Sequence, residues 1–216
     1  MAELRVNTVG TTGAGTRLLV LVHGYGADEY DLAGLVPHID PRGRFFSISP
    51  RGPHSVMGIG AGWYERDDHG NIDPAMFTGS VDALDATIDK ACGDHGLDRS
   101  DAVIIGFSQG GAMTLASALR TPGAARPAAI ACLSGMLTEL AGLKYVFRDP
   151  AASEPLPEIL IHHGTLDPVV AVDRGRAIRD SLAEHGVDLT YREYPMQHEI
   201  SAASMRDLRD WLADLS

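Results

Sequence analysis

Short, nearly continuous apolar runs alternate with longer amphipathic segments along this chain of 216 residues. Such short runs are typical of strands that are buried on both faces of a sheet. They occupy Leu18–Val22, Phe45–Ile48, Ala102–Phe107, Ala128–Leu133 and Ile159–His162, and Leu189–Tyr194 reads as one more strand. Helical periodicity lies between or after them, over Glu29–His38, Val81–Cys92, Gly110–Leu119, Ala171–His185 and Ala202–Leu215. Strands that alternate with helices in this way predict an α/β fold, a three-layer sandwich around a mostly parallel sheet.

Two long stretches, Pro50–Pro74 and Gly135–Pro157, lack clear periodicity. Long irregular segments within a compact domain are usually functional or disordered, so both are candidate walls or lids of a site. No internal repeat, low-complexity tract or linker divides the sequence. We therefore expect residues 1–216 to form a single domain.

The charge balance narrows the range of partners. Lys and Arg number 18 and Asp and Glu 29, which gives a formal net charge of −11. A field of this sign repels nucleic acid and anionic membrane surfaces, so neither is an expected partner. The N-terminus lacks the basic and apolar regions of a secretory signal, and no apolar stretch approaches the roughly 20 residues of a membrane span. The expected location is the cytoplasm. The sequence does not determine the oligomeric state, and a homodimer is compatible with it.

Neither a metal nor another cofactor is expected. Cys92 and Cys132 fall in a predicted helix and a predicted strand, where reduced and buried thiols are favoured over a disulfide. His162 and His163 are adjacent on a strand, so their side chains point to opposite faces and do not readily share one ion. The glycine run Gly58–Gly62 is not followed by a helix, as a phosphate-binding loop would be, and is expected to form a flexible loop.

The pattern Gly-x-Ser-x-Gly occurs at Gly106-Phe107-Ser108-Gln109-Gly110. It follows the predicted strand Ala102–Phe107 directly and leads into the predicted helix Gly110–Leu119. A serine on such a strand–turn–helix elbow is exposed at the edge of the sheet, and the flanking glycines relieve steric conflict. Because this context is what the motif requires, Ser108 is the predicted nucleophile.

A serine hydroxyl needs a base and a group that orients the base, and in this type of fold the acid and then the histidine follow the serine along the chain. Asp167 lies in the loop after the strand Ile159–His162, although it could instead cap a turn or helix. His198 lies between the last predicted strand and helix, and is favoured as the base. His185, at a helix end, is a weaker rival, and His95 precedes the serine.

Two backbone N–H groups are needed to stabilise a developing oxyanion. One is expected from Gln109, the residue after the nucleophile. The other is expected from the loop His23-Gly24-Tyr25-Gly26, which follows the first apolar strand, with the Tyr25 amide as the donor. His23 is expected to be a structural, hydrogen-bonding residue beside this loop.

Together these segments resemble the phospholipase/carboxylesterase branch of the α/β-hydrolases, which includes acyl-protein thioesterases and small bacterial esterases. The resemblance extends over nearly the whole chain. It rests on Val22–Gly26, Gly106–Gly111, Leu133–Gly135, His163–Val170 and His198–Ser201. It implies an α/β-hydrolase fold and the roles already given to Ser108, Asp167, His198, Tyr25 and Gln109. Gln197 departs from the glycine that usually precedes the histidine in this family.

The residues and the resemblance predict a carboxylic ester hydrolase that acts on a small-molecule ester, with thioesters and lysophospholipids as further candidates. Trp63, Met136 and Leu137 are candidate substrate-binding residues, because they lie in the two aperiodic stretches. Core packing is the alternative for Trp63, and a short packed helix is the alternative for the stretch after Gly135. There are two alternative functions. One is a hydrolase of amide or C–C bonds, and the other is a non-catalytic binding protein that keeps the fold.

Overall fold

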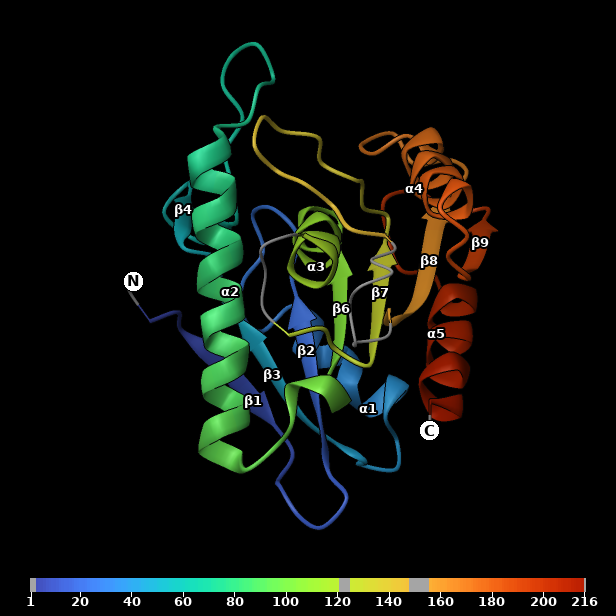
Figure 1. Cartoon of the computed structure of the whole chain (residues 1–216). Helices are drawn as coiled ribbons and strands as arrows, with labels where there is room; N and C mark the ends of the chain where they lie inside the picture. The colour runs from blue at the N-terminus through green and yellow to red at the C-terminus, as the bar shows by residue number, and fades with distance from the viewer. Residues whose placement is uncertain (1–2, 121–124, 148–155, 216) are drawn as a thin grey trace.

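The computed structural model describes residues 3–120, 125–147 and 156–215, and a seven-stranded sheet lies at its centre (Figure 1). In spatial order the strands are β1 (Val6–Val9), β3 (Phe45–Pro50), β2 (Arg17–Val22), β6 (Val103–Phe107), β7 (Ala129–Leu133), β8 (Glu158–Gly164) and β9 (Thr190–Tyr194). β1 runs antiparallel to β3, and the other neighbouring pairs are parallel. The predicted mostly parallel sheet is therefore confirmed.

Helices cover both faces of the sheet, which gives the three predicted layers. One face is covered by α2 (Pro74–His95), α3 (Gln109–Leu119) and α4 (Val172–Glu184), and the other by α1 (Val36–Ile39) and α5 (Ala202–Asp214). The strands divide the core by alternation: Val20 and Val22 pack with the first set of helices, and Leu19 and Leu21 with the second. None of the described helices has the length and apolar character needed to cross a membrane.

The helix predicted over Glu29–His38 was wrong in its extent. The structure has a 3₁₀ turn, Leu32–Leu35, followed by the single turn of α1. Glu29 is almost completely buried, and its carboxylate pairs with Arg51 at 2.8 Å. Because a buried carboxylate must keep its partner, this contact holds the start of the stretch near the end of β3 instead of in a helix.

The structure also contains elements that the sequence pattern did not predict. These are β1 and a small hairpin of β4 (His54–Val56) and β5 (Gly60–Gly62). Gly58–Gly62 is thus only partly the expected loop. A Cβ atom at Gly60 would lie 2.1 Å from the Gly26 carbonyl oxygen, so glycine is needed where the hairpin packs on the loop after β2.

α2 is longer than the predicted Val81–Cys92. The Asp73 side chain caps its first turn by accepting a hydrogen bond from the Ala75 N–H at 2.8 Å, and Pro74 suits its first position. The helix ends at Gly96, which adopts the left-handed conformation (φ 64°). Local capping residues therefore set both ends.

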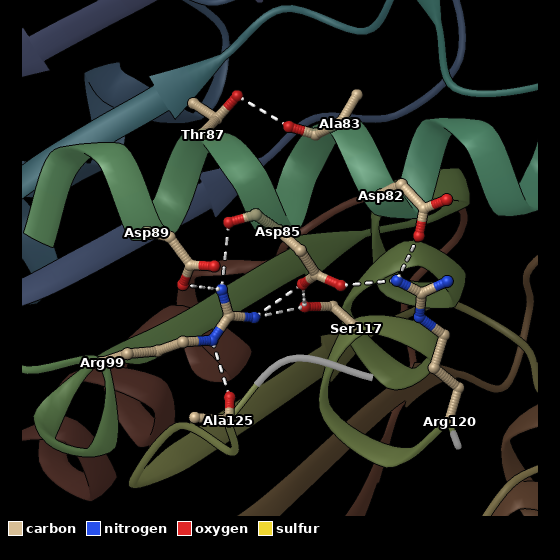
Figure 2. Close-up of polar contacts among 9 residues, drawn as sticks. All are labelled: Asp82, Ala83, Asp85, Thr87, Asp89, Arg99, Ser117, Arg120 and Ala125. Carbon is tan, nitrogen blue, oxygen red and sulfur yellow. Dashed lines mark hydrogen bonds and ion pairs between the residues drawn. The ribbon is translucent and has the colours of Figure 1, made fainter. Parts of the chain in front are cut away.

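A buried polar network ties α2 to the C-terminal half of α3 (Figure 2). Arg99 donates to the Asp85 carboxylate at 2.6 Å, and the Ser117 hydroxyl donates to the same oxygen at 2.5 Å. Arg120 donates to the other Asp85 oxygen at 2.8 Å. Asp85 and Arg99 are only 5% and 6% exposed. Since removing one partner would leave a buried charge uncompensated, the network fixes α3 against α2.

Cys92 and Cys132 are buried and not joined in a disulfide, as expected. Burial raises the pKa of the Cys132 thiol to about 12. A thiol held in this protonated state is a poor nucleophile, so Cys132 serves the packing of β7.

Candidate active site

Ser108 lies at the turn between β6 and α3, in a backbone conformation that non-glycine residues rarely adopt (φ 56°, ψ −117°). The turn is tight enough to require its glycines. A Cβ atom at Gly106 would lie 2.2 Å from the Gly110 carbonyl oxygen, and one at Gly110 would lie 1.9 Å from the Val22 carbonyl oxygen. The strained turn projects the serine beyond the carboxyl end of β6, as the elbow motif predicts.

The structure brings together the three residues that the sequence nominated. His198 Nε2 lies 2.8 Å from Ser108 Oγ, and its Nδ1 lies 2.7 Å from Asp167 Oδ2. Asp167 also accepts hydrogen bonds from the N–H groups of Val169 and Val170, each at 2.8 Å.

Burial alone would raise the pKa of Asp167, but the hydrogen bond from His198 and the two backbone donors together hold the pKa below its ordinary value. The ionised carboxylate therefore accepts the Nδ1–H of His198, which leaves Nε2 free to accept the proton of Ser108. The alternative interpretation of Asp167 as a turn cap is also correct, because the same carboxylate accepts hydrogen bonds from His198 and from the backbone of its own loop.

The rival histidines lie elsewhere. His185 donates through Nδ1 to the Ser181 carbonyl at 2.7 Å, at the end of α4, which is the interaction expected for it. The His95 ring packs on Phe46, with ring centroids 4.2 Å apart. Neither residue contacts Ser108 in the described structure.

The two residues whose amides are expected to form an oxyanion hole line the same cavity as the serine. Gln109 is the first residue of α3, so its N–H has no partner within the helix and lies at the positive end of the helix dipole. Tyr25 follows Gly24, where an added Cβ would be 3.4 Å from the Ser108 Cβ. Within the residues that the structure describes, neither amide donates a hydrogen bond to the protein.

His23 anchors the loop that carries Tyr25. Its Nδ1 donates to the Gly24 carbonyl at 2.7 Å, and its Nε2 accepts from the Gly52 N–H at 3.0 Å. The Trp63 indole N–H donates to the His23 carbonyl at 3.0 Å. Burial lowers the pKa of His23, in agreement with one donating and one accepting ring nitrogen. His23 therefore has the structural role that the sequence predicts.

A cavity of about 660 Å³ contains Ser108. Its other lining residues are Tyr25, Tyr64, Arg66, Gln109, Met136, Val169, Val170, Ala171 and Arg174. They come from the loop after β2, the segment before α2, the segment after β7 and the start of α4, all at the end of the molecule where the parallel strands end (Figure 1). Ligands bind at this edge in most open α/β sheets.

Trp63 does not line this cavity, which corrects the first of the substrate-binding candidates. Its side chain is 0% exposed and belongs to the core. Gln109 holds this segment: its Oε1 accepts from the Trp63 N–H at 2.7 Å, and its Nε2 donates to the Tyr64 carbonyl at 2.6 Å. The side chain of Gln109 thus fixes the backbone of the Trp63–Tyr64 segment, in which both rings are buried and only Tyr64 lines the cavity.

Met136 lines the cavity, whereas Leu137 lies in an adjoining hollow of about 330 Å³. The apolar residues that follow mostly pack on the core: Leu140, Leu143 and Tyr145 contact it and Phe147 is part of it. The short packed helix that was the alternative for this stretch is absent from residues 135–147. Residues 148–155 of the predicted wall or lid lie outside the described residues.

Sequence reasoning missed Arg66 and Arg174. Arg174 stands in the first turn of the helix after the Asp167 loop, a position that the chain order could have indicated. No sequence signal marked Arg66, which lies in an irregular segment. Among residues 3–120, 125–147 and 156–215, no three His, Cys, Asp or Glu side chains gather in a way that could hold a metal ion.

A sequence model described as phospholipase/carboxylesterase matches residues 7–216. Carboxylesterase SOBER1 of Arabidopsis thaliana is 32% identical over 142 residues, which are 65% of this chain and only 60% of that protein. Acyl-protein thioesterase 1 of Neurospora crassa is 30% identical, over 92% of this chain and 86% of its own length. The crystal structure of esterase PE8 is similar over the full length of both chains, with a TM-score of 0.83 and 26% identity.

Proposed function

Since the chain belongs to the phospholipase/carboxylesterase family, we propose that it is a serine carboxylesterase that hydrolyses small to medium acyl esters. Thioesters and lysophospholipids are further candidate substrates. One observation carries the proposal, the continuous chain of hydrogen bonds from Ser108 Oγ through His198 to Asp167, at 2.8 and 2.7 Å. Such an arrangement activates a hydroxyl as a nucleophile.

In the first half of the reaction, Ser108 Oγ attacks the ester carbonyl while His198 Nε2 takes the hydroxyl proton. The new Oγ–C bond places negative charge on the carbonyl oxygen, which the amides of Tyr25 and Gln109 stabilise. When the bond to the leaving oxygen or sulfur breaks, His198 gives its proton to the leaving group. An alcohol or thiol departs, and the acyl group remains on Ser108.

In the second half, a water molecule attacks the acyl-enzyme and His198 takes its proton. The Oγ–C bond breaks, the proton passes to Ser108, and the carboxylic acid leaves. Asp167 stays ionised throughout and stabilises the imidazolium that forms twice. The balance is one ester and one water consumed, and one acid and one alcohol formed.

The nucleophile is tested with a fluorophosphonate label and with Ser108→Ala. The label should attach to Ser108, and the variant should lose both labelling and turnover by several orders of magnitude while remaining folded. Ser134→Ala is a matched control, because Ser134 also has a positive φ (49°) and a buried hydroxyl but contacts no base. A label found at another residue would overturn the assignment.

The type of bond is tested with matched panels of 4-nitrophenyl esters, thioesters and anilides of the same acyl groups. We expect ester and thioester hydrolysis and little cleavage of the anilides. The predicted single domain over residues 1–216, the cytoplasmic location and the homodimer stay predictions, which limited proteolysis, cell fractionation and light scattering test.

A further inference from the structure

Two arginines, Arg66 and Arg174, line the cavity that contains Ser108. Within the described part of the chain, no Asp or Glu lines this cavity. Such a cationic lining is unexpected in a protein that has 29 acidic residues and 18 basic ones. Both side chains are solvent-exposed, so they can reach a bound molecule.

Neither arginine has a carboxylate partner in the described residues. Arg66 donates to the Gly70 carbonyl at 2.9 Å, contacts Met136 Sδ at 3.6 Å and interacts with the Tyr64 hydroxyl, and none of these partners is a carboxylate. On α4, Arg176 and Arg179 each pair with a carboxylate, at 2.8 and 2.7 Å, whereas Arg174 does not. Of the three arginines of α4, the one without a carboxylate partner is therefore the one that lines the cavity.

Both arginines also line the adjoining hollow, with Met136 shared between them. They thus stand on the boundary between the two spaces. Glu139 lines this second hollow, and among the described residues it forms no ion pair with either arginine. Tyr25, Val169 and Val170 give the main cavity an apolar surface. The site therefore combines a reacting serine, an apolar wall and a cationic edge.

We propose that Arg66 and Arg174 select esters that carry an anionic group, a carboxylate or a phosphate; this inference rests on the proposed esterase function. A guanidinium is always charged, and its planar donors match the two oxygens of a carboxylate or phosphate. In such an ester, the acyl chain would pack on the apolar wall and the anionic group would contact the two arginines, while the ester carbonyl reaches Ser108.

The experiment compares neutral and anionic esters as matched pairs. The carboxylate arm uses 4-nitrophenyl hexanoate and the 4-nitrophenyl monoester of adipic acid. The phosphate arm uses 1-octanoylglycerol and its 3-phosphate. For each pair, the ratio of kcat/KM for the anionic ester to that for the neutral ester is measured in the wild type, Arg66→Gln, Arg174→Gln and Arg66→Lys. Arg179→Gln is the control, because it removes an arginine of α4 that does not line the cavity.

We expect each Gln variant to lower the anionic-to-neutral ratio about tenfold in at least one arm. Arg66→Lys should lose less, and Arg179→Gln should keep the wild-type ratio. The arm that responds identifies the anionic group. Raising the ionic strength should raise KM for the anionic ester only, since screening shortens the Debye length from about 30 Å at 0.01 M to about 8 Å at 0.15 M.

Two outcomes would refute different claims. If the wild type hydrolyses these esters but the ratios are the same in all the variants, the selection by arginines is wrong and the esterase proposal stands. If the wild type hydrolyses neither member of any pair and Ser108 takes no fluorophosphonate label, the proposed function fails, and the inference fails with it. Fluorophosphonate labelling of each variant shows that its site is still assembled.

Discussion

Protonation of the buried His162 is expected to destabilise the fold as the pH falls from about 6.5 toward about 4. His162 is 0% exposed on β8. Its Nδ1 lies 2.9 Å from the Ser204 hydroxyl and its Nε2 lies 3.2 Å from the Tyr194 hydroxyl, which itself donates to Asp207 at 2.8 Å. Nε2 therefore donates to Tyr194 and Nδ1 accepts from Ser204. A second ring proton would break this pattern.

Burial lowers the pKa of His162 to about 4, against the partly opposing charge of Asp207 and with the help of Arg192. In the unfolded chain the same group titrates near its ordinary value of about 6.5. The unfolded state consequently binds more protons between these two values, so the stability present above pH 6.5 is lost as the pH falls. The full difference corresponds to about 3 kcal/mol. About 2 kcal/mol of it is lost by pH 5.

The assay is urea-induced unfolding at several pH values between about 7.5 and 4.5. The wild type is compared with His162→Gln, in which this titration is absent, so that other titrating groups cancel in the difference. The free energies of unfolding of the two proteins should converge by about 2 kcal/mol between pH 7 and pH 5. Ile161→Val, on the same strand, is the control: it loosens the core without removing the imidazole, and its pH dependence should parallel that of the wild type. Parallel curves for His162→Gln would refute the reasoning.

Three further predictions concern the site. Asp167→Asn should lower kcat by about 10³–10⁴-fold with the fold retained, because the amide no longer orients and stabilises the histidine; steady-state kinetics and circular dichroism check this. Gln109→Ala keeps the backbone donor but leaves the Trp63 N–H and the Tyr64 carbonyl without their partner, so urea unfolding should show a loss of about 1–3 kcal/mol. Met136→Ala should shift the preferred acyl length in a 4-nitrophenyl ester series, whereas Leu137→Ala, whose side chain lies in the adjoining hollow, should not.

Much of the fold and the family were predictable from local sequence. Apolar runs between amphipathic segments predicted the parallel sheet and its covering helices, and the motifs around Ser108 predicted the family, which is confirmed. Chain order then nominated Asp167 as the acid and favoured His198 over His185 and His95 as the base. These inferences were possible because strand–turn–helix geometry and the order of the loops at one sheet edge depend on contiguous residues and their place in the chain.

The elements that local pattern missed depend on pairing between distant backbones. β1 joins the sheet beside β3, and β5 packs on the loop after β2 through glycines that carry no apolar pattern. The local sequence also did not show which of Trp63 and Tyr64 lines the cavity. Gln109, far away in the sequence, holds the backbone of both residues; both side chains are buried in the core, and only Tyr64 also lines the cavity.

The sequence by itself determined the order of the main strands and helices, the elbow that carries Ser108, and the acid and histidine proposed to act with it, since each depends on a short motif and its place in the chain. Only the tertiary structure decided which side chains surround that serine. Arg66 and Arg174 come from segments that are far apart along the chain, and their missing carboxylate partners become visible only when the fold places every neighbouring charge. A charge acts through distance in space, and separation along the sequence does not fix that distance.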